Sequence, residues 1–117
     1  MKRLYRATIN TLRGLAWGIR TEAALREEAV VLALALPLGL LIAPSVAWYV
    51  AMIAALLVVL AVELLNTAIE KLADHVTREQ HPQIGLIKDY GSAAVFCALC
   101  IAGLVWLAAL ALRFKIV

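Results

Sequence analysis

Three long apolar runs dominate this sequence and limit what the chain can fold into. Residues 29–43 read AVVLALALPLGLLIA, residues 48–61 carry no charge, and residues 90–112 form the longest of the three runs. Hydrophobic residues make up 65% of the 117-residue chain, against about 45–50% in soluble domains. A single domain of this length cannot bury so much apolar side chain, so the sequence predicts an integral membrane protein.

The lengths of the apolar runs predict three transmembrane helices. At about 1.5 Å per residue, a first helix over residues 29–46 barely crosses the hydrocarbon core, and Pro37 is expected to kink it. A second helix is predicted over residues 48–74, because the helical pattern continues past the first charged position, and a third over residues 90–112. The polar segment 75–87 is predicted to be a cytoplasmic loop.

The first 24 residues are predicted to form an amphipathic helix on the membrane surface. On a helical wheel its apolar stripe comprises Leu4, Thr8, Leu12, Leu15 and Ile19, and the opposite side carries Arg3, Arg6, Arg13 and Arg20. A surface anchor and a contribution to a functional site both remain open for this helix. The fold class is therefore an all-α membrane protein, with residues 1–117 as a single domain.

The distribution of positive charge predicts the orientation. Nine of the 11 lysine and arginine residues lie within residues 1–28 or 71–88, and only Arg113 and Lys115 follow the last apolar run. By the positive-inside rule, the N-terminus and the second loop are cytoplasmic and the chain is a multi-pass protein. The net charge of +3 thus reflects topology, and no nucleic-acid partner is expected.

The stretch VELLNTAIEKLADHV, which follows the second apolar run, places polar groups where they are costly. Glu63, Asn66, Glu70 and Asp74 lie on one face of a helix, at or just below the cytoplasmic interface. An ionised side chain deep in a spanning helix costs roughly 2.5–3.5 kcal/mol. Solvation at a helix end accounts for Asp74, whereas the other three are expected to share a metal, a lysine or a proton.

Polar residues from the other segments are expected at the same depth. Glu22 and Glu28 precede the first apolar run, while Lys88 and Asp89 precede the third. Carboxylates from separate elements suit Mg²⁺, which completes its shell with phosphate oxygens and water. A lysine neutralises phosphate, and a glutamate can accept the proton of an incoming hydroxyl. The pattern predicts an interfacial site for phosphoryl transfer, without the common nucleotide motifs GxxxxGK[ST] and GxGxxG.

Three motifs connect the chain to a known family. EAALREE at 22–28, VELLNTAIEKLAD at 62–74 and KDYGSAAV at 88–95 strongly resemble the prokaryotic diacylglycerol kinases, and the resemblance runs from about Arg3 to Trp106. It implies a homotrimer in the bacterial inner membrane, with active sites shared between subunits. Such an enzyme transfers the γ-phosphate of ATP, with Mg²⁺, to diacylglycerol and forms phosphatidic acid. The related undecaprenol kinases are the alternative.

The resemblance also implies roles for individual residues. Glu63 matches the proton acceptor, although Glu70 remains open as the base, and Glu22 with Glu70 match the ligands of the metal. Further catalytic positions are Asn66, Lys88 and Asp89. Residues matching nucleotide contacts are Arg3, Glu22, Glu70, Glu79, His81, Lys88 and Asp89, and those matching lipid contacts are Glu28, Glu63, Ser92 and Trp106. Asn10 and Gln80 stand where tyrosines occur in the best-known branch, so ring stacking on the nucleotide is not expected there.

Two other classes of protein are weighed against a kinase. A small multidrug transporter would have four spans and a glutamate near mid-bilayer, whereas here the acids lie at one interface. A non-catalytic assembly factor would use the small residues of the third run for helix packing. That reading predicts that replacing Glu63 or Glu70 with glutamine leaves function unchanged.

Overall fold

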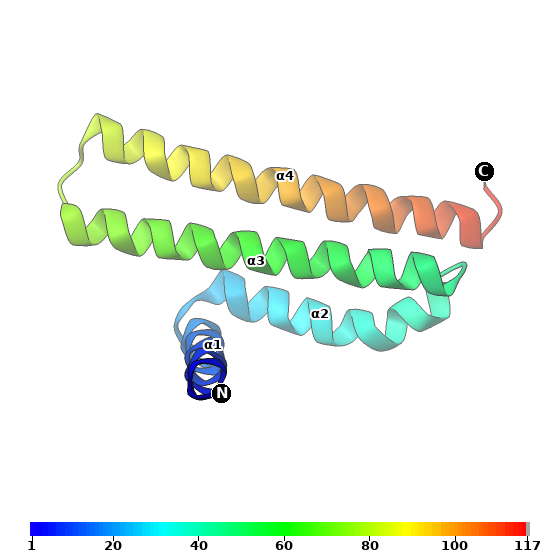
Figure 1. Ribbon diagram of the computed structural model, residues 1–117. Helices are drawn as coiled ribbons and strands as arrows, with labels where there is room; N and C mark the ends of the chain where they lie inside the picture. The colour runs from blue at the N-terminus through cyan, green and yellow to red at the C-terminus, as the bar shows by residue number, and fades with distance from the viewer. Residues whose placement is uncertain (117) are drawn as a thin grey trace.

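The chain folds into four helices over the described residues 1–116 of a computed structural model (Figure 1). In chain order these are α1 (Lys2–Thr21), α2 (Ala23–Ile42), α3 (Val46–Val76) and α4 (Pro82–Arg113). No strand occurs within this range, so the predicted all-α class is confirmed.

Helices α3 and α4 form an antiparallel pair that runs side by side along its whole length (Figure 1). Its core is built from small side chains: Ala55 and Val59 of α3 pack with Ala98 and Ala102 of α4. Such residues let two helix backbones approach closely, which is how helices associate in lipid. Farther from the loop, the indole of Trp106 donates a hydrogen bond to the Met52 carbonyl at 3.1 Å.

Among the described residues, α3 and α4 are the two helices long and apolar enough to cross a membrane. With 31 residues, α3 is about 46 Å long, so it exceeds a hydrocarbon core of about 30 Å. Helix α2 also covers most of the first apolar run, but Arg26, Glu27 and Glu28 occupy its first two turns. The prediction of three spanning helices is therefore confirmed for two of them.

Several helix boundaries differ from the sequence prediction, among them the end of α2 and the start of α4. Helix α2 ends at Ile42 and continues through Pro37, so the segment predicted at 29–46 ends early. Helix α4 begins at Pro82, which confines the connection predicted at 75–87 to residues 77–81. The reason is local: the His81 imidazole accepts a hydrogen bond from the Gln83 N–H at 3.1 Å and caps the helix, and proline suits a first helical position. Pro82 starts a helix here.

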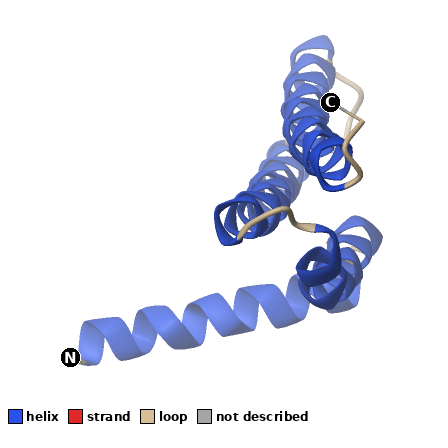
Figure 2. Ribbon diagram, turned by 90° about the vertical axis from the view of Figure 1, so that its right-hand side faces the viewer, coloured by secondary structure: helices blue, strands red, loops and turns tan. Residues whose placement is uncertain are grey.

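Helix α1 lies apart from the bundle, with the N-terminus at its far end (Figure 2). It meets α2 at Glu22, whose backbone is extended, and Gly18 is buried near Leu25 and Leu64. The helix predicted over residues 1–24 thus ends at Thr21. Its apolar stripe is uncovered in the single chain, because Leu4 is 70% exposed and Leu12 is 60% exposed.

Candidate active site

The face of α3 that carries Glu63, Asn66, Glu70 and Asp74 is called the polar stripe. It faces α4 near the end that carries the loop. Asn66 is the one buried polar side chain among the described residues, at 7% exposure. Its amide nitrogen donates to Glu70 Oε1 at 3.1 Å, so the amide holds that carboxylate from one turn away. Asn66 Oδ1 is buried and has no hydrogen-bond partner within residues 1–116. The sequence-predicted pair of Asn66 and Glu70 is therefore assembled within one helix.

Gly91 of α4 makes room for this amide. A Cβ added at position 91 would collide with Asn66 Oδ1, so only glycine lets α4 lie this close to the polar stripe. Gly103, farther along the same helix, has no neighbour that an added Cβ would meet. The close approach at Gly91 is therefore specific to the polar end of the helix pair.

A second group of carboxylates lies between α2 and α3. Glu28 and Glu63 are both half-buried, and their charges repel each other across the two helices. Glu63 also interacts electrostatically with Glu70, which links this group to the pair formed with Asn66. Glu28 Oε2 is buried and lacks a hydrogen-bond partner among the described residues. Among the described residues, the Glu63 side chain forms no hydrogen bond and no ion pair.

Glu22 lies at the joint between α1 and α2 and reaches α3. Its backbone is fixed on both sides: its N–H donates to the Gly18 carbonyl at 2.8 Å, and its carbonyl accepts from Arg26 at 3.1 Å. Its carboxylate forms an ion pair with Lys71 of α3, with 2.9 Å between Nζ and Oε1. Lys71 follows Glu70 directly, so this ion pair brings Glu22 to the polar end of α3.

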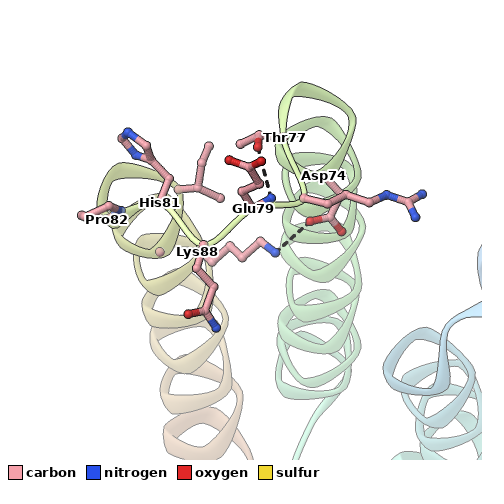
Figure 3. Close-up of a pocket in the computed structure, with 10 residues that line it drawn as sticks. Asp74, Thr77, Glu79, His81, Pro82 and Lys88 are labelled. Carbon is pink, nitrogen blue, oxygen red and sulfur yellow. Dashed lines mark hydrogen bonds and ion pairs between the residues drawn. The ribbon is translucent and has the colours of Figure 1, made fainter.

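The loop between α3 and α4 encloses an open cavity of about 560 Å³. Figure 3 shows Glu79, His81 and Lys88 around it, together with Asp74 and Thr77. The Lys88 ammonium lies 2.9 Å from Asp74 Oδ1, and the Thr77 hydroxyl accepts from the Glu79 N–H at 3.1 Å. Three residues predicted to contact nucleotide thus line one cavity, and the Lys88 ammonium supplies a positive charge there.

The single chain leaves other predicted site residues apart. Arg3 is the second residue of α1, and the N-terminal end of this helix points away from the other three helices (Figure 2). Asp89 and Ser92 are exposed on α4 beyond Lys88. Trp106 follows Ser92 by fourteen residues, or about 21 Å of helix, and it lines a separate apolar cavity between α2, α3 and α4. The single chain therefore gathers only part of the predicted set.

The described residues do not form a complete metal site by themselves. Within residues 1–116, no group of three or more His, Cys, Asp or Glu side chains is placed to hold a metal ion. Glu22 and Glu70 present hard carboxylate oxygens, and Glu22 already holds a cationic group. One or two carboxylates completed by phosphate oxygens and water is the coordination that suits Mg²⁺. Two carboxylates fit a divalent cation whose shell is completed by water or by phosphate oxygens.

Three residues of this region were not identified from the sequence. Lys71 was not placed in the site, Asp74 was interpreted as a solvated helix end, and Gly91 was interpreted only as a small packing residue. Their partners Glu22, Lys88 and Asn66 lie on other elements, which a periodicity argument within one helix does not detect. The nearest signal was the proximity of Lys71 to Glu70 in the sequence.

Comparison with known proteins gives one consistent result. The family model for prokaryotic diacylglycerol kinase matches residues 9–110. The chain is 39% identical over 103 residues to a diacylglycerol kinase of Haemophilus influenzae, covering 88% of this chain and 87% of the relative. It is 40% identical over 106 residues to that of Pseudomonas aeruginosa, covering 91% and 86% of the two chains. The Escherichia coli K12 protein is 35% identical over 104 residues, covering 89% and 85%.

Proposed function

Because this chain belongs to the prokaryotic diacylglycerol kinase family and is a lipid kinase, we propose that it phosphorylates diacylglycerol with ATP. The product is phosphatidic acid. The observation that carries this proposal is the family match over residues 9–110, which covers all of α2 and α3 and most of α1 and α4. The resemblance of the three sequence motifs supports the same substrate.

The proposed reaction takes place at the cytoplasmic face of the inner membrane. We infer that α2 spans together with α3 and α4, since its 20 residues reach about 30 Å. Helix α1 then lies in the interface, where lipid would cover its exposed apolar stripe. The lysine and arginine residues along α1 and between residues 71 and 88 support a cytoplasmic location for this end.

A homotrimer with shared active sites accounts for the residues that one subunit leaves apart. Arg3 is a proposed nucleotide contact, yet it is not among the residues that line the loop cavity of its own chain. A neighbouring subunit would bring a second α1 to that cavity. Extensive apolar exposure along α2 and α4 leaves surface for such contacts.

Glu63 is the proposed proton acceptor for the lipid hydroxyl. Its carboxylate lies on the polar stripe with Asn66 and Glu70, and no ion pair in the described chain holds it. It is half-buried beside Glu28, where α2 and α3 meet. A lipid whose hydroxyl reaches this position from the bilayer would be oriented by Glu28 and Ser92, with Trp106 contacting its apolar part.

The nucleotide is proposed to bind between the loop cavity and the polar stripe. Glu79, His81, Lys88 and Asp89 would hold ATP, with Lys88 neutralising phosphate charge. Glu22 and Glu70 would hold Mg²⁺, and Asn66 fixes the Glu70 carboxylate. When bound, Mg²⁺ neutralises the charge of the transferred phosphoryl group. The chain itself therefore contributes positioning, cationic side chains and one base.

The proposal is tested by phosphate transfer in mixed micelles. Purified protein receives magnesium ATP labelled at the γ-phosphate, with diacylglycerol in one reaction and undecaprenol in another. Label in phosphatidic acid supports the proposed activity. Label only in the polyprenyl product would keep the kinase chemistry and reject the proposed lipid. Absence of label in both products, from folded protein, would contradict the assigned activity.

A further inference from the structure

The ion pair between Lys71 and Glu22 joins the α1–α2 joint to α3. The Nζ–Oε1 distance is 2.9 Å, and the two side chains are unequally exposed, at 68% for Lys71 and 28% for Glu22. The Lys71 ammonium also interacts with the charges of Glu70 and Asp74. The Lys71 ammonium thus interacts with three carboxylates, those of Glu22, Glu70 and Asp74, at the polar end of α3.

Within the described chain, this ammonium is the only ion-pair partner of the Glu22 carboxylate. The backbone of Glu22 is held by Gly18 and Arg26, so the side chain starts from a fixed point. Lys71 then fixes where the carboxylate ends. An exposed ion pair of this kind is weak, so a stronger cation can displace it at little cost.

We propose that Lys71 is a positioning residue that holds the Glu22 carboxylate before nucleotide binds and competes with the divalent cation for it. This inference rests on the proposed function, in which Glu22 and Glu70 receive the cation. A divalent cation shared by these two carboxylates would lie beside the ammonium of the residue that follows Glu70. Two like charges so close repel, and Lys71 must turn away when the cation binds.

The exposure of Lys71 makes this exchange possible. A lysine carries its charge on a flexible stem of four carbons, so the ammonium can move into solvent or toward a phosphate without moving α3. The carboxylate of Glu22, being half-buried and anchored at the joint, stays behind. Lys71 thus sets how much divalent cation is needed to occupy Glu22.

The test measures Mn²⁺ binding to the nucleotide-free protein in detergent, from the electron paramagnetic resonance signal of free Mn²⁺. Lys71→Gln is expected to bind Mn²⁺ roughly two- to fivefold more tightly than the wild type, the range that an exposed ion pair allows. Lys71→Arg keeps the charge and should stay near the wild-type affinity. In a Glu22→Gln background, Lys71→Gln should give no tightening, because the carboxylate for which they compete is gone.

An unchanged or weaker affinity in Lys71→Gln would overturn the proposal. So would tightening that persists in the Glu22→Gln background, or a failure of Mn²⁺ to bind both the wild type and Lys71→Gln. Phosphate transfer by the same preparations separates this result from the function itself. Active enzyme with unchanged Mn²⁺ affinity would reject only the role of Lys71, whereas inactive wild type would reject the proposed kinase activity.

Discussion

The two ends of the α3–α4 pair are held together by different kinds of contact. Away from the loop, Ala55, Val59, Ala98 and Ala102 pack as a continuous apolar core, and Trp106 donates to a backbone carbonyl of α3. Near the loop, the contacts are made by charged or amide groups. Lys88 of α4 pairs with Asp74 of α3, Glu22 of the α1–α2 joint pairs with Lys71 of α3, and Asn66 donates to Glu70 within α3.

The apolar end of the α3–α4 pair is therefore expected to contribute stability, and the polar end to contribute chemistry. Packing of small residues in lipid is specific and leaves few groups free to exchange partners. Exposed ion pairs are individually weak and can be replaced by a ligand. We therefore expect changes at the apolar end, apart from the proposed lipid contact Trp106, to alter stability alone, and changes at the polar end to alter activity more than stability.

Glu63→Gln should have the largest effect on activity. Loss of the proposed base should lower kcat by about 10²–10⁴-fold, the usual contribution of general base catalysis. The KM for ATP should stay near the wild-type value, because Glu63 is not a proposed nucleotide contact. Steady-state phosphate transfer measures both constants. If Glu70→Gln gives this pattern and Glu63→Gln does not, the base is misassigned.

Gly91→Ala should damage both properties, because the polar end is also closely packed at this point. The added Cβ would collide with Asn66 Oδ1, and overpacking of this kind costs about 1–3 kcal/mol. Thermal unfolding in detergent should show a lower Tm, and phosphate transfer should fall as Asn66 shifts away from Glu70.

Gly103→Ala is the matched control, since an added Cβ there meets no neighbour. Alanine is a better helix former than glycine by about 1 kcal/mol, so stability should stay equal or rise. Equal losses in the two variants would show that close packing at Gly91 has no special importance.

Tyr49→Phe probes the apolar end. The Tyr49 hydroxyl donates to the Leu36 carbonyl at 2.9 Å, joining α3 to α2. Losing this bond should lower the free energy of unfolding by about 0.5–1.5 kcal/mol. Activity below the melting range should be unchanged, because Tyr49 lies fourteen residues, or about 21 Å, from Glu63. A reduced kcat at low temperature would contradict the proposal that this contact at the apolar end affects stability alone.

Asp74→Asn should produce the smallest effect. Lys88 would lose the carboxylate that holds it 2.9 Å away at the loop cavity, and its flexible stem would be ordered only by the nucleotide. The KM for ATP should rise roughly two- to fivefold, with a smaller change in kcat. Asp74→Glu keeps the charge and should remain closer to wild type. A lower KM would mean instead that Asp74 competes with ATP for Lys88.

Helical periodicity and charge were sufficient to predict most of the helices and the polar stripe. Glu63, Asn66 and Glu70 share a face because their spacing follows the helical repeat, which can be read within one segment. The ion pair of Lys71 with Glu22 could not be read this way, because it depends on where the α1–α2 joint meets α3. Pro82 was misread as part of a loop, since a proline can break a helix or begin one.

The most direct test of the difference between the two ends is to determine from which face of the membrane the protein uses ATP. Phosphatidic acid formation would be measured in sealed bacterial membrane vesicles, either inverted or right-side-out, with ATP added outside only. Transfer in the inverted vesicles alone is predicted, because the cytoplasmic face would carry Lys88 and the loop cavity. Transfer only in right-side-out vesicles, with ATP at the face of Arg113, would contradict the account.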